Sequence, residues 1–233
     1  MNHELLMERF FEALINGDRT GARALIEEAS HAGYSPRDLV IDLFWPTYQL
    51  VQRLYREDQL TTLAHRLSTR LLRVLVDQTA LRLGRANAIR RSTLAFCGPS
   101  DADELGAQMA VDILESEGFA VTFAGGGIAT DEIIAATHER RPGILLMFSS
   151  AAQDLPTIRE VIDRLREIGA CPDTQIAVGG GVFNRAEGLA EEIGADIWAN
   201  DPLELAEVLI ARPSQRASSE QRTVGRNRRA KAA

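Results

Sequence analysis

The chain has 233 residues, of which 45% are hydrophobic and 25% charged, and its formal net charge is −7. This length and apolar content suit one large domain or two small ones, and the acidic balance excludes a general polyanion-binding protein. With only two cysteines, Cys97 and Cys171, we expect no disulfide framework and a reducing, cytoplasmic location. No apolar run approaches the roughly 18–20 residues that span a bilayer, and no signal peptide is recognisable, so we expect no membrane contact.

The first 88 residues predict an all-helical domain. Apolar residues recur at helical spacing in 3–15 and again in 20–33. Ser35, Pro36 and Asp38 form a start signal for a third helix that runs to about residue 56, and Pro46 is expected to kink this helix. A fourth helix is expected from about residue 61 to residue 83. Four helices with short connections indicate a helical bundle.

The pattern changes at about residue 92, where short apolar runs begin to alternate with helical segments. The runs are STLAFCG, AVTFAGG, GILLMFSS, TQIAVGGG and ADIWAND. The helices are expected at about 103–117, 130–140, 155–168, 184–193 and 202–211. Five such β-α units over residues 89–211 predict an α/β fold, a doubly wound parallel sheet with helices on both faces. A ligand of such a sheet binds beyond the carboxyl ends of the strands.

The segment 212–233 has a different composition. It holds seven basic residues and one acidic residue, with few apolar side chains, and we expect it to be a disordered basic tail. One interpretation is an electrostatic contact with nucleic acid or an acidic partner, and the other is a tail that only aids solubility. The chain shows no helix-turn-helix or zinc-finger pattern, so a nucleic-acid contact would be to phosphates and non-specific.

Three loops at the carboxyl ends of the predicted strands carry the candidate site. The stretch Asp101-Ala102-Asp103-Glu104-Leu105-Gly106 follows the first strand. By residue type alone, Asp103 is favoured as the N-cap of the helix that follows. Ser149 and Ser150 follow the third strand, and Gly179-Gly180-Gly181 follows the fourth. Glycines at these ends allow a flat ligand to approach the backbone closely.

In this order of parts the chain resembles the cobalamin-binding module of corrinoid proteins, a four-helix cap followed by a flavodoxin-like domain. The resemblance spans about residues 2–211. The family signature D-x-H-x-x-G falls on Asp101–Gly106, so Asp103 stands where the family has the histidine that ligates cobalt from below. Carboxylate is a harder ligand than imidazole and a poor substitute for it on cobalt. The resemblance therefore implies cobalamin bound without a ligand from Asp103, with haem, a bilin or no cofactor as alternatives.

The resemblance also implies which side chains of the cap face the cofactor. Light-responsive members of the family carry a tryptophan and, about ten residues on, a Glu-His pair, and these positions correspond to Tyr55, His65 and Arg66. His65 is thereby a candidate metal ligand, and a packed or surface histidine is the alternative. The complete set of cofactor-binding candidates is Tyr55, His65, Asp101, Asp103, Gly106, Ser149, Ser150, Gly179, Gly180, Gly181 and Phe183.

The chain shows no Ser/His/Asp set and no Cys/His set for nucleophilic catalysis, and it has no G-x-x-x-x-G-K loop. We therefore expect a binding module and not an enzyme. The resemblance is closest in kind to cobalamin- or haem-binding photosynthesis antirepressors and light-responsive regulators. It implies a non-enzymatic photoreceptor or other tetrapyrrole sensor that signals to a protein partner such as a transcription repressor. One alternative is a corrinoid carrier protein of a methyltransferase system, which the missing histidine disfavours. Another is a cofactor-free interaction module.

Overall fold

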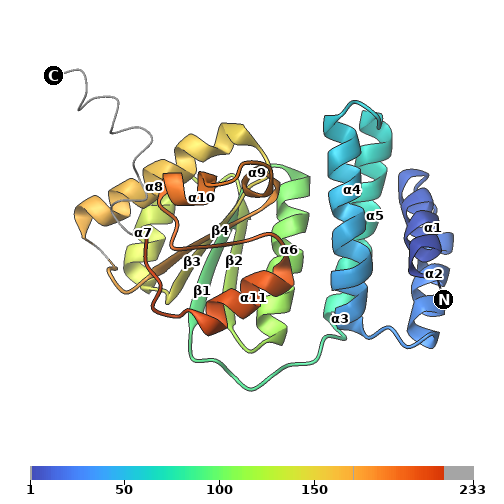
Figure 1. The fold of residues 1–233 in the computed structure, drawn as a ribbon, viewed down its shortest axis with the longest axis horizontal. Helices are drawn as coiled ribbons and strands as arrows, with labels where there is room; N and C mark the ends of the chain where they lie inside the picture. Colours follow the sequence, from blue (N-terminus) through green and yellow to red (C-terminus); the bar gives the residue numbers. More distant parts are fainter. Residues whose placement is uncertain (1, 170, 218–233) are drawn as a thin grey trace. The chain divides into compact units, whose positions relative to one another are not determined.

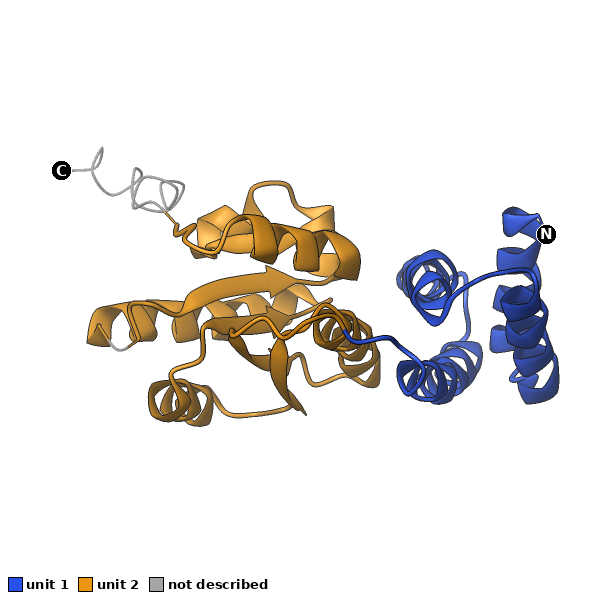
Figure 2. Cartoon of the chain, turned by 90° about the horizontal axis from the view of Figure 1, so that it is seen from below, with its two compact units in different colours: residues 1–85 blue, residues 86–233 orange. Residues whose placement is uncertain are grey.

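The computed structural model describes residues 2–169 and 171–217. The chain divides into two compact units, residues 1–85 and residues 86–233 (Figure 2). The division falls in the segment that joins the last helix of the first unit to the first strand of the second. No helix in the described parts of the chain combines the length and the apolar character needed to cross a membrane.

The first unit is helical, as predicted. Its main helices are α1 (His3–Ile15), α2 (Arg19–His31), α4 (Trp45–Arg56) and α5 (Thr62–Ala80). Polar side chains accept backbone N–H bonds at the starts of three of them, from Asn2, Asp18 and Thr61. Large apolar side chains fill the centre, and the rings of Phe10 and Phe44 stack there at 5.5 Å between centroids.

The third predicted helix is continuous but irregular. Ser35 and Asp38 form a capping box at the start of α3 (Pro36–Asp38), and the chain then widens into the π-helical turn η1 (Leu39–Phe44) before α4. The backbone N–H of Trp45 bonds to the carbonyl of Val40, five residues back. Pro46 follows and has no N–H to donate, so the disturbance expected at this proline takes the form of a π turn.

The second unit contains a five-stranded parallel sheet. Its strands are β1 (Ser92–Cys97), β2 (Ala120–Gly126), β3 (Ile144–Phe148), β4 (Gln175–Gly179) and β5 (Ile197–Ala199), in the order β2-β1-β3-β4-β5. Figure 1 labels β1 to β4. All residues of β3 and β4 are buried, as expected for central strands with both faces covered. The order is that of a flavodoxin-like sheet, and the predicted fold class is confirmed.

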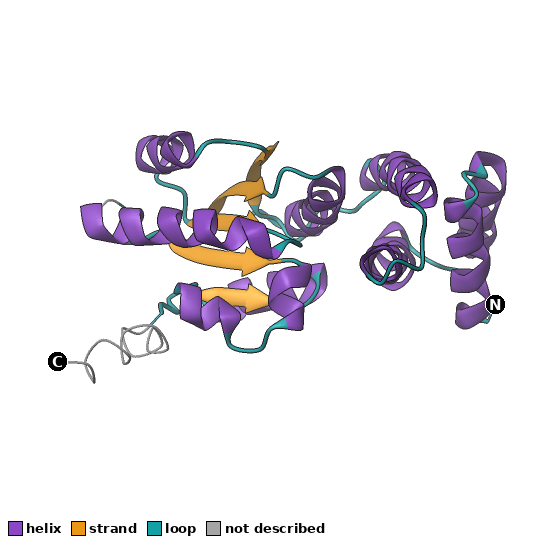
Figure 3. Ribbon diagram, turned by 90° about the horizontal axis from the view of Figure 1, so that it is seen from above, coloured by secondary structure: helices purple, strands orange, loops and turns teal. Residues whose placement is uncertain are grey.

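Helices cover both faces of the sheet (Figure 3). The helices α6 (Asp101–Ser116) and α11 (Pro202–Ala211) contact each other, and α7 (Thr130–Arg140) contacts α8 (Leu155–Ile168). Side chains of α7 and α8 pack with alternate residues of the strands, such as Leu94, Leu145 and Ile176, in one apolar core. Because side chains alternate across a sheet, the intervening strand residues face the other layer.

The last predicted helix before β5 is broken in two. The structure has α9 (Gly181–Arg185) and α10 (Leu189–Ile193) where the sequence predicts one helix over 184–193. Ala186 is extended and Gly188 has a φ of 78°. A left-handed residue cannot continue a right-handed helix, so the chain turns at this glycine.

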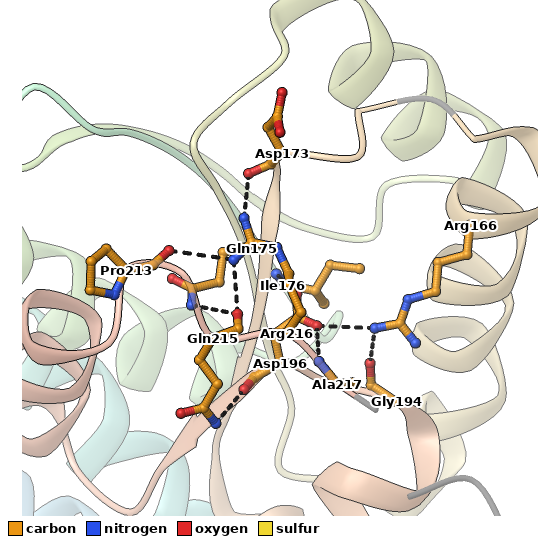
Figure 4. A network of polar contacts seen from close by, with 10 residues as sticks. All are labelled: Arg166, Asp173, Gln175, Ile176, Gly194, Asp196, Pro213, Gln215, Arg216 and Ala217. Atoms are coloured by element: carbon orange, nitrogen blue, oxygen red, sulfur yellow. Dashed lines mark hydrogen bonds and ion pairs between the residues drawn. The ribbon is translucent and has the colours of Figure 1, made fainter. Parts of the chain in front are cut away.

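The segment 212–217, which the composition predicts to be disordered, is attached to the second unit (Figure 4). The side-chain amide of Gln175 donates to the carbonyls of Arg212 and Gln215, at 2.9 and 3.0 Å. The N–H of Ala217 donates to the buried carboxylate of Asp196 at 2.7 Å. Residues 212–217 therefore form a strap across the amino ends of β4 and β5. The remainder of the predicted basic tail, 218–233, lies outside the described residues.

Candidate functional site

The carboxyl ends of β1, β3 and β4 are joined directly to one another. The N–H of Gly98 donates to the carbonyl of Phe148 at 2.9 Å, and the N–H of Ser149 donates to the carbonyl of Gly179 at 3.0 Å. Parallel strands end at the same edge of their sheet, so the three loops that sequence analysis selected meet there. We refer to these three loops, 98–100, 149–151 and 180–181, as the carboxyl edge.

Asp103 is not the N-cap of its helix, contrary to the expectation from residue type. The N-cap of α6 is Ser100, whose hydroxyl oxygen accepts the N–H of Asp103 at 3.0 Å. In return, the Ser100 hydroxyl donates to Oδ2 of Asp103 at 2.6 Å. Ser100 has the extended backbone that an N-cap requires. The helix therefore begins three residues earlier than a cap at Asp103 would allow.

The carboxylate of Asp103 also bonds to the loop after β3. Its Oδ1 accepts the backbone N–H of Ser150 at 2.7 Å, and the residue is only 2% exposed. Both oxygens of the carboxylate are thus used by short hydrogen bonds to groups of the carboxyl edge. Asp103 itself lies in the first turn of α6.

The other two candidates of the signature segment have different surroundings. Asp101 is the first residue of α6 and is exposed, whereas Gly106 is buried within the helix. The segment Asp101–Gly106 is therefore helical throughout.

Ser149 is fully buried, and its hydroxyl is occupied within the protein. It donates to Oδ2 of Asp154 at 2.9 Å and accepts the N–H of Ala151 at 3.2 Å. A Cβ placed on Gly98 would lie 2.6 Å from Oδ2 of Asp103 and 2.8 Å from Oδ2 of Asp154. The two carboxylates therefore flank Gly98 closely. Sequence analysis missed Asp154, although its position five residues after Ser149 in the same loop was a usable signal.

The glycines after β4 allow two loops to touch. Gly180 has a φ of 106°, and a Cβ there would lie 2.1 Å from the carbonyl oxygen of Ser149. Gly181 faces Ser150 and Arg185, and Arg185 donates to the carbonyl of Ser150 at 2.7 Å. The close approach to Ser149 explains why position 180 needs a glycine. The predicted contact of Gly180 with a flat ligand stays a prediction.

Phe183 lies in the apolar core and is 8% exposed. Gly179 ends β4 and pairs with Phe148 of the neighbouring strand. These two candidates therefore belong to the frame that carries the carboxyl edge.

A pocket of about 310 Å³ opens beside the carboxyl edge, on the side of α7 and α8. Its walls are mostly apolar, with Phe96, Met147 and Ile158 among them, and Asp154 supplies a carboxylate. The volume lies at the lower end of the range of small-molecule sites, about 300–1,000 Å³. Neither Asp103 nor the serine pair lines this pocket.

The two candidates of the helical unit contact each other. The rings of Tyr55 and His65 stack with centroids 3.9 Å apart and an interplanar angle of 14°. Nε2 of His65 lies 3.1 Å from the amide oxygen of Gln52, a residue that sequence analysis did not select. Burial and the nearby charge of Arg66 lower the pKa of His65 below its ordinary value. A neutral ring that donates from Nε2 to Gln52 keeps its lone pair on Nδ1.

Across the described ranges, 2–169 and 171–217, no group of three or more His, Cys, Asp and Glu side chains is placed to hold a metal ion. The donor groups at the carboxyl edge are carboxylates and hydroxyls that bond to each other. This edge offers hydrogen-bonding and apolar surface, and position 103 does not fit the role of a cobalt ligand.

Comparison with known proteins identifies the family. Residues 91–207 match the model of the B12 binding domain, and residues 6–78 match a second B12 binding domain model. The chain belongs to the B12 binding domain family. Cobalamin, the first choice of the sequence analysis, is confirmed as the cofactor of this family, and the haem and bilin alternatives receive no support.

The similar proteins are corrinoid proteins. The chain is 19% identical to monomethylamine corrinoid protein 1 of Methanosarcina mazei over 216 residues, covering 90% of this chain and 98% of that protein. It is 22% identical over 174 residues to the methanol–corrinoid protein of Methanosarcina barkeri, covering 75% of this chain and 67% of that protein. The solved structure of the Methanosarcina barkeri monomethylamine corrinoid protein matches with a TM-score of 0.70 at 17% identity. The match covers 89% of this chain and 98% of that protein.

These findings correct the functional expectation. The predicted likeness to photosynthesis antirepressors, and with it the sensor, photoreceptor and transcription-repressor assignments, is wrong because the relatives are corrinoid proteins. That expectation gave decisive weight to the missing histidine at position 103. Similarity to the corrinoid proteins instead extends along both units of the chain. A cofactor-binding module, and not an enzyme, agrees with these relatives, whereas nucleic acid as a partner receives no support from them.

Proposed function

We propose that this chain is a corrinoid carrier protein of a methyltransferase system. It binds cobalamin and holds it while a methyl group is added to cobalt and later removed. The observation that carries the proposal is the match of both units to B12 binding domain models, in the order found in corrinoid proteins of nearly the same length. The partner that this function requires is a methyltransferase, because a carrier must receive its methyl group from one protein and deliver it to another.

In this proposal each unit has its own predicted cofactor contacts. In the second unit they are Ser150 and Gly181 of the carboxyl edge and the exposed Asp101 at the start of α6. Tyr55 and His65 are the contacts from the helical unit. Support for the latter pair comes from their stacked rings, which form a flat aromatic surface, and from burial and the charge of Arg66, which lower the pKa of His65.

The proposal is tested by loading the full chain with hydroxocobalamin and removing free cofactor by gel filtration. The cobalt is then reduced to Co(I) with titanium(III) citrate, and methyl iodide is added. Reaction of Co(I) with methyl iodide yields methyl-Co(III) and iodide, a change that is visible by absorption. A carrier keeps the corrinoid through both states, so about one cobalt per chain should co-elute with the protein before and after methylation. Loss of the corrinoid on methylation would contradict the proposal.

A further inference from the structure

We infer that Asp103 is a clasp between two loops of the sheet edge, and that a corrinoid bound to this chain receives no nitrogen ligand from the second unit. The inference rests on the proposed function only where it concerns the bound corrinoid. The clasp itself is a property of the protein without cofactor.

The geometry of Asp103 carries the first step. Its Oδ2 accepts from the Ser100 hydroxyl at 2.6 Å, and its Oδ1 accepts from the Ser150 N–H at 2.7 Å. The loop after β1 is thereby tied to the loop after β3. To reach a metal ion, this carboxylate would have to leave both partners, and a backbone N–H at the sheet edge would lose its acceptor.

The immediate surroundings leave Asp103 little freedom to move. It is 2% exposed, and its Oδ2 lies so close to Gly98 that a Cβ on this glycine would come within 2.6 Å. The residue sits in the first turn of α6, which Ser100 starts by accepting the N–H of Asp103 itself. Ser100 therefore bonds to both the side chain and the backbone of Asp103, and moving the side chain away would break its bonds to the Ser100 hydroxyl and the Ser150 N–H.

The placement of the histidines carries the second step independently. The chain has four histidines, and His138 is the only one in residues 86–233. His138 is exposed in the last turn of α7, a helix that begins after the carboxyl end of β2 and leads back to the amino end of β3. It therefore lies toward the opposite edge of the sheet. The second unit has no imidazole at its carboxyl edge.

The second unit therefore offers no imidazole to the cobalt of a bound corrinoid. A corrinoid bound to this chain would keep its own base or water on the cobalt where the second unit supplies no nitrogen. A nitrogen from the protein would have to come from the helical unit, where His65 is the candidate.

The test uses cob(II)inamide, a corrinoid without a nucleotide base, bound to the full chain and observed by electron paramagnetic resonance. In a His65→Ala variant, we expect the cobalt signal to show no splitting from a nitrogen ligand. Splitting that is present in the wild type and lost in this variant would place the ligand in the helical unit and agree with the inference. Splitting that persists in His65→Ala would overturn it.

The Asp103→Asn variant separates the clasp from a ligand role. Asparagine is nearly isosteric, but its amide NH₂ cannot accept the second of the two hydrogen bonds. We expect the Tm of the cofactor-free chain to fall by about 2–8 °C, and the cobalt spectrum of the bound cob(II)inamide to stay unchanged. An altered cobalt spectrum with an unchanged Tm would overturn the inference. If wild type binds no corrinoid, the proposed function fails, whereas the fall in Tm still decides the clasp.

Discussion

The backbone N–H of Ser150 donates a 2.7 Å hydrogen bond to Oδ1 of Asp103, across 47 residues of sequence. This bond joins the loops after β1 and β3. It is made to a buried carboxylate, and removal of the acceptor would break this bond at the sheet edge.

Replacing Asp103 by alanine should therefore destabilise the protein. The loss of the hydrogen bonds from Ser100 and Ser150 is expected to lower the free energy of unfolding by about 1–3 kcal/mol. The measurement is urea unfolding followed by circular dichroism. The control is Glu115→Ala, which removes an exposed carboxylate from the last turn of the same helix. Equal stability of the two variants would contradict the role of Asp103 as a clasp.

A methyl group on Gly180 should damage the sheet edge. Its φ of 106° is left-handed, and the added Cβ would lie 2.1 Å from the carbonyl oxygen of Ser149. We expect Gly180→Ala to lose more than about 2 kcal/mol of stability, because the left-handed backbone alone costs about 1–2 kcal/mol. Gly188→Ala is the matched control, since Gly188 has a φ of 78° but no atom within 4 Å of an added Cβ. Losses of the same size in both variants would show that the close approach to Ser149 does not matter.

The stability of the protein should depend on pH through His65. Burial and the charge of Arg66 lower the pKa of His65 from 6.5 in the folded state. The unfolded chain therefore binds the proton more readily, and the free energy of unfolding falls as pH drops below about 6.5 toward the folded pKa. His65→Phe keeps a ring to stack on Tyr55 and should lose this part of the slope, as measured by urea unfolding between pH 5 and pH 8. His138→Gln is the exposed-histidine control, and an identical slope in wild type and His65→Phe would contradict a lowered pKa of the half-buried His65.

Truncation should distinguish the strap 212–217 from the rest of the C-terminal segment. A chain that ends at Ala217 keeps the bonds to Gln175 and Asp196, and its thermal unfolding should match that of the full chain. A chain that ends at Ala211 lacks the carbonyls that accept from the Gln175 amide. It also lacks the N–H of Ala217, which donates to Asp196. Because both side chains are buried, this truncation should lower the free energy of unfolding by about 1–3 kcal/mol. Matching unfolding curves for both truncations would show that the strap does not stabilise the sheet.

The order of helices and strands was predictable because it depends on local patterns. The buried run ILLMF of β3 (Ile144–Phe148) and the capping box of Ser35 and Asp38 are visible in a few neighbouring residues. The same holds for the signature segment at Asp101–Gly106. The contacts that this segment makes were not predictable, because the partner of Asp103 is Ser150, which is distant in sequence.

The N-cap of α6 and the attachment of residues 212–217 also differ from the prediction, because both depend on contacts outside the local sequence. Ser100 and Asp103 are both good N-cap residues, and the choice between them depends on where the chain leaves β1. Polar composition predicted a disordered tail from Arg212. It did not show that the buried Gln175 and Asp196 need hydrogen-bond partners, which the residues 212–217 supply.

The most direct test of corrinoid binding is calorimetric titration of the cofactor-free full chain with hydroxocobalamin at micromolar concentration. We expect a saturable binding curve with one cobalamin per chain, and haem or biliverdin under the same conditions should give no such curve. A titration that yields no binding heat with cobalamin, together with no cobalt in the protein fraction after gel filtration, would contradict the assignment of this chain as a corrinoid carrier.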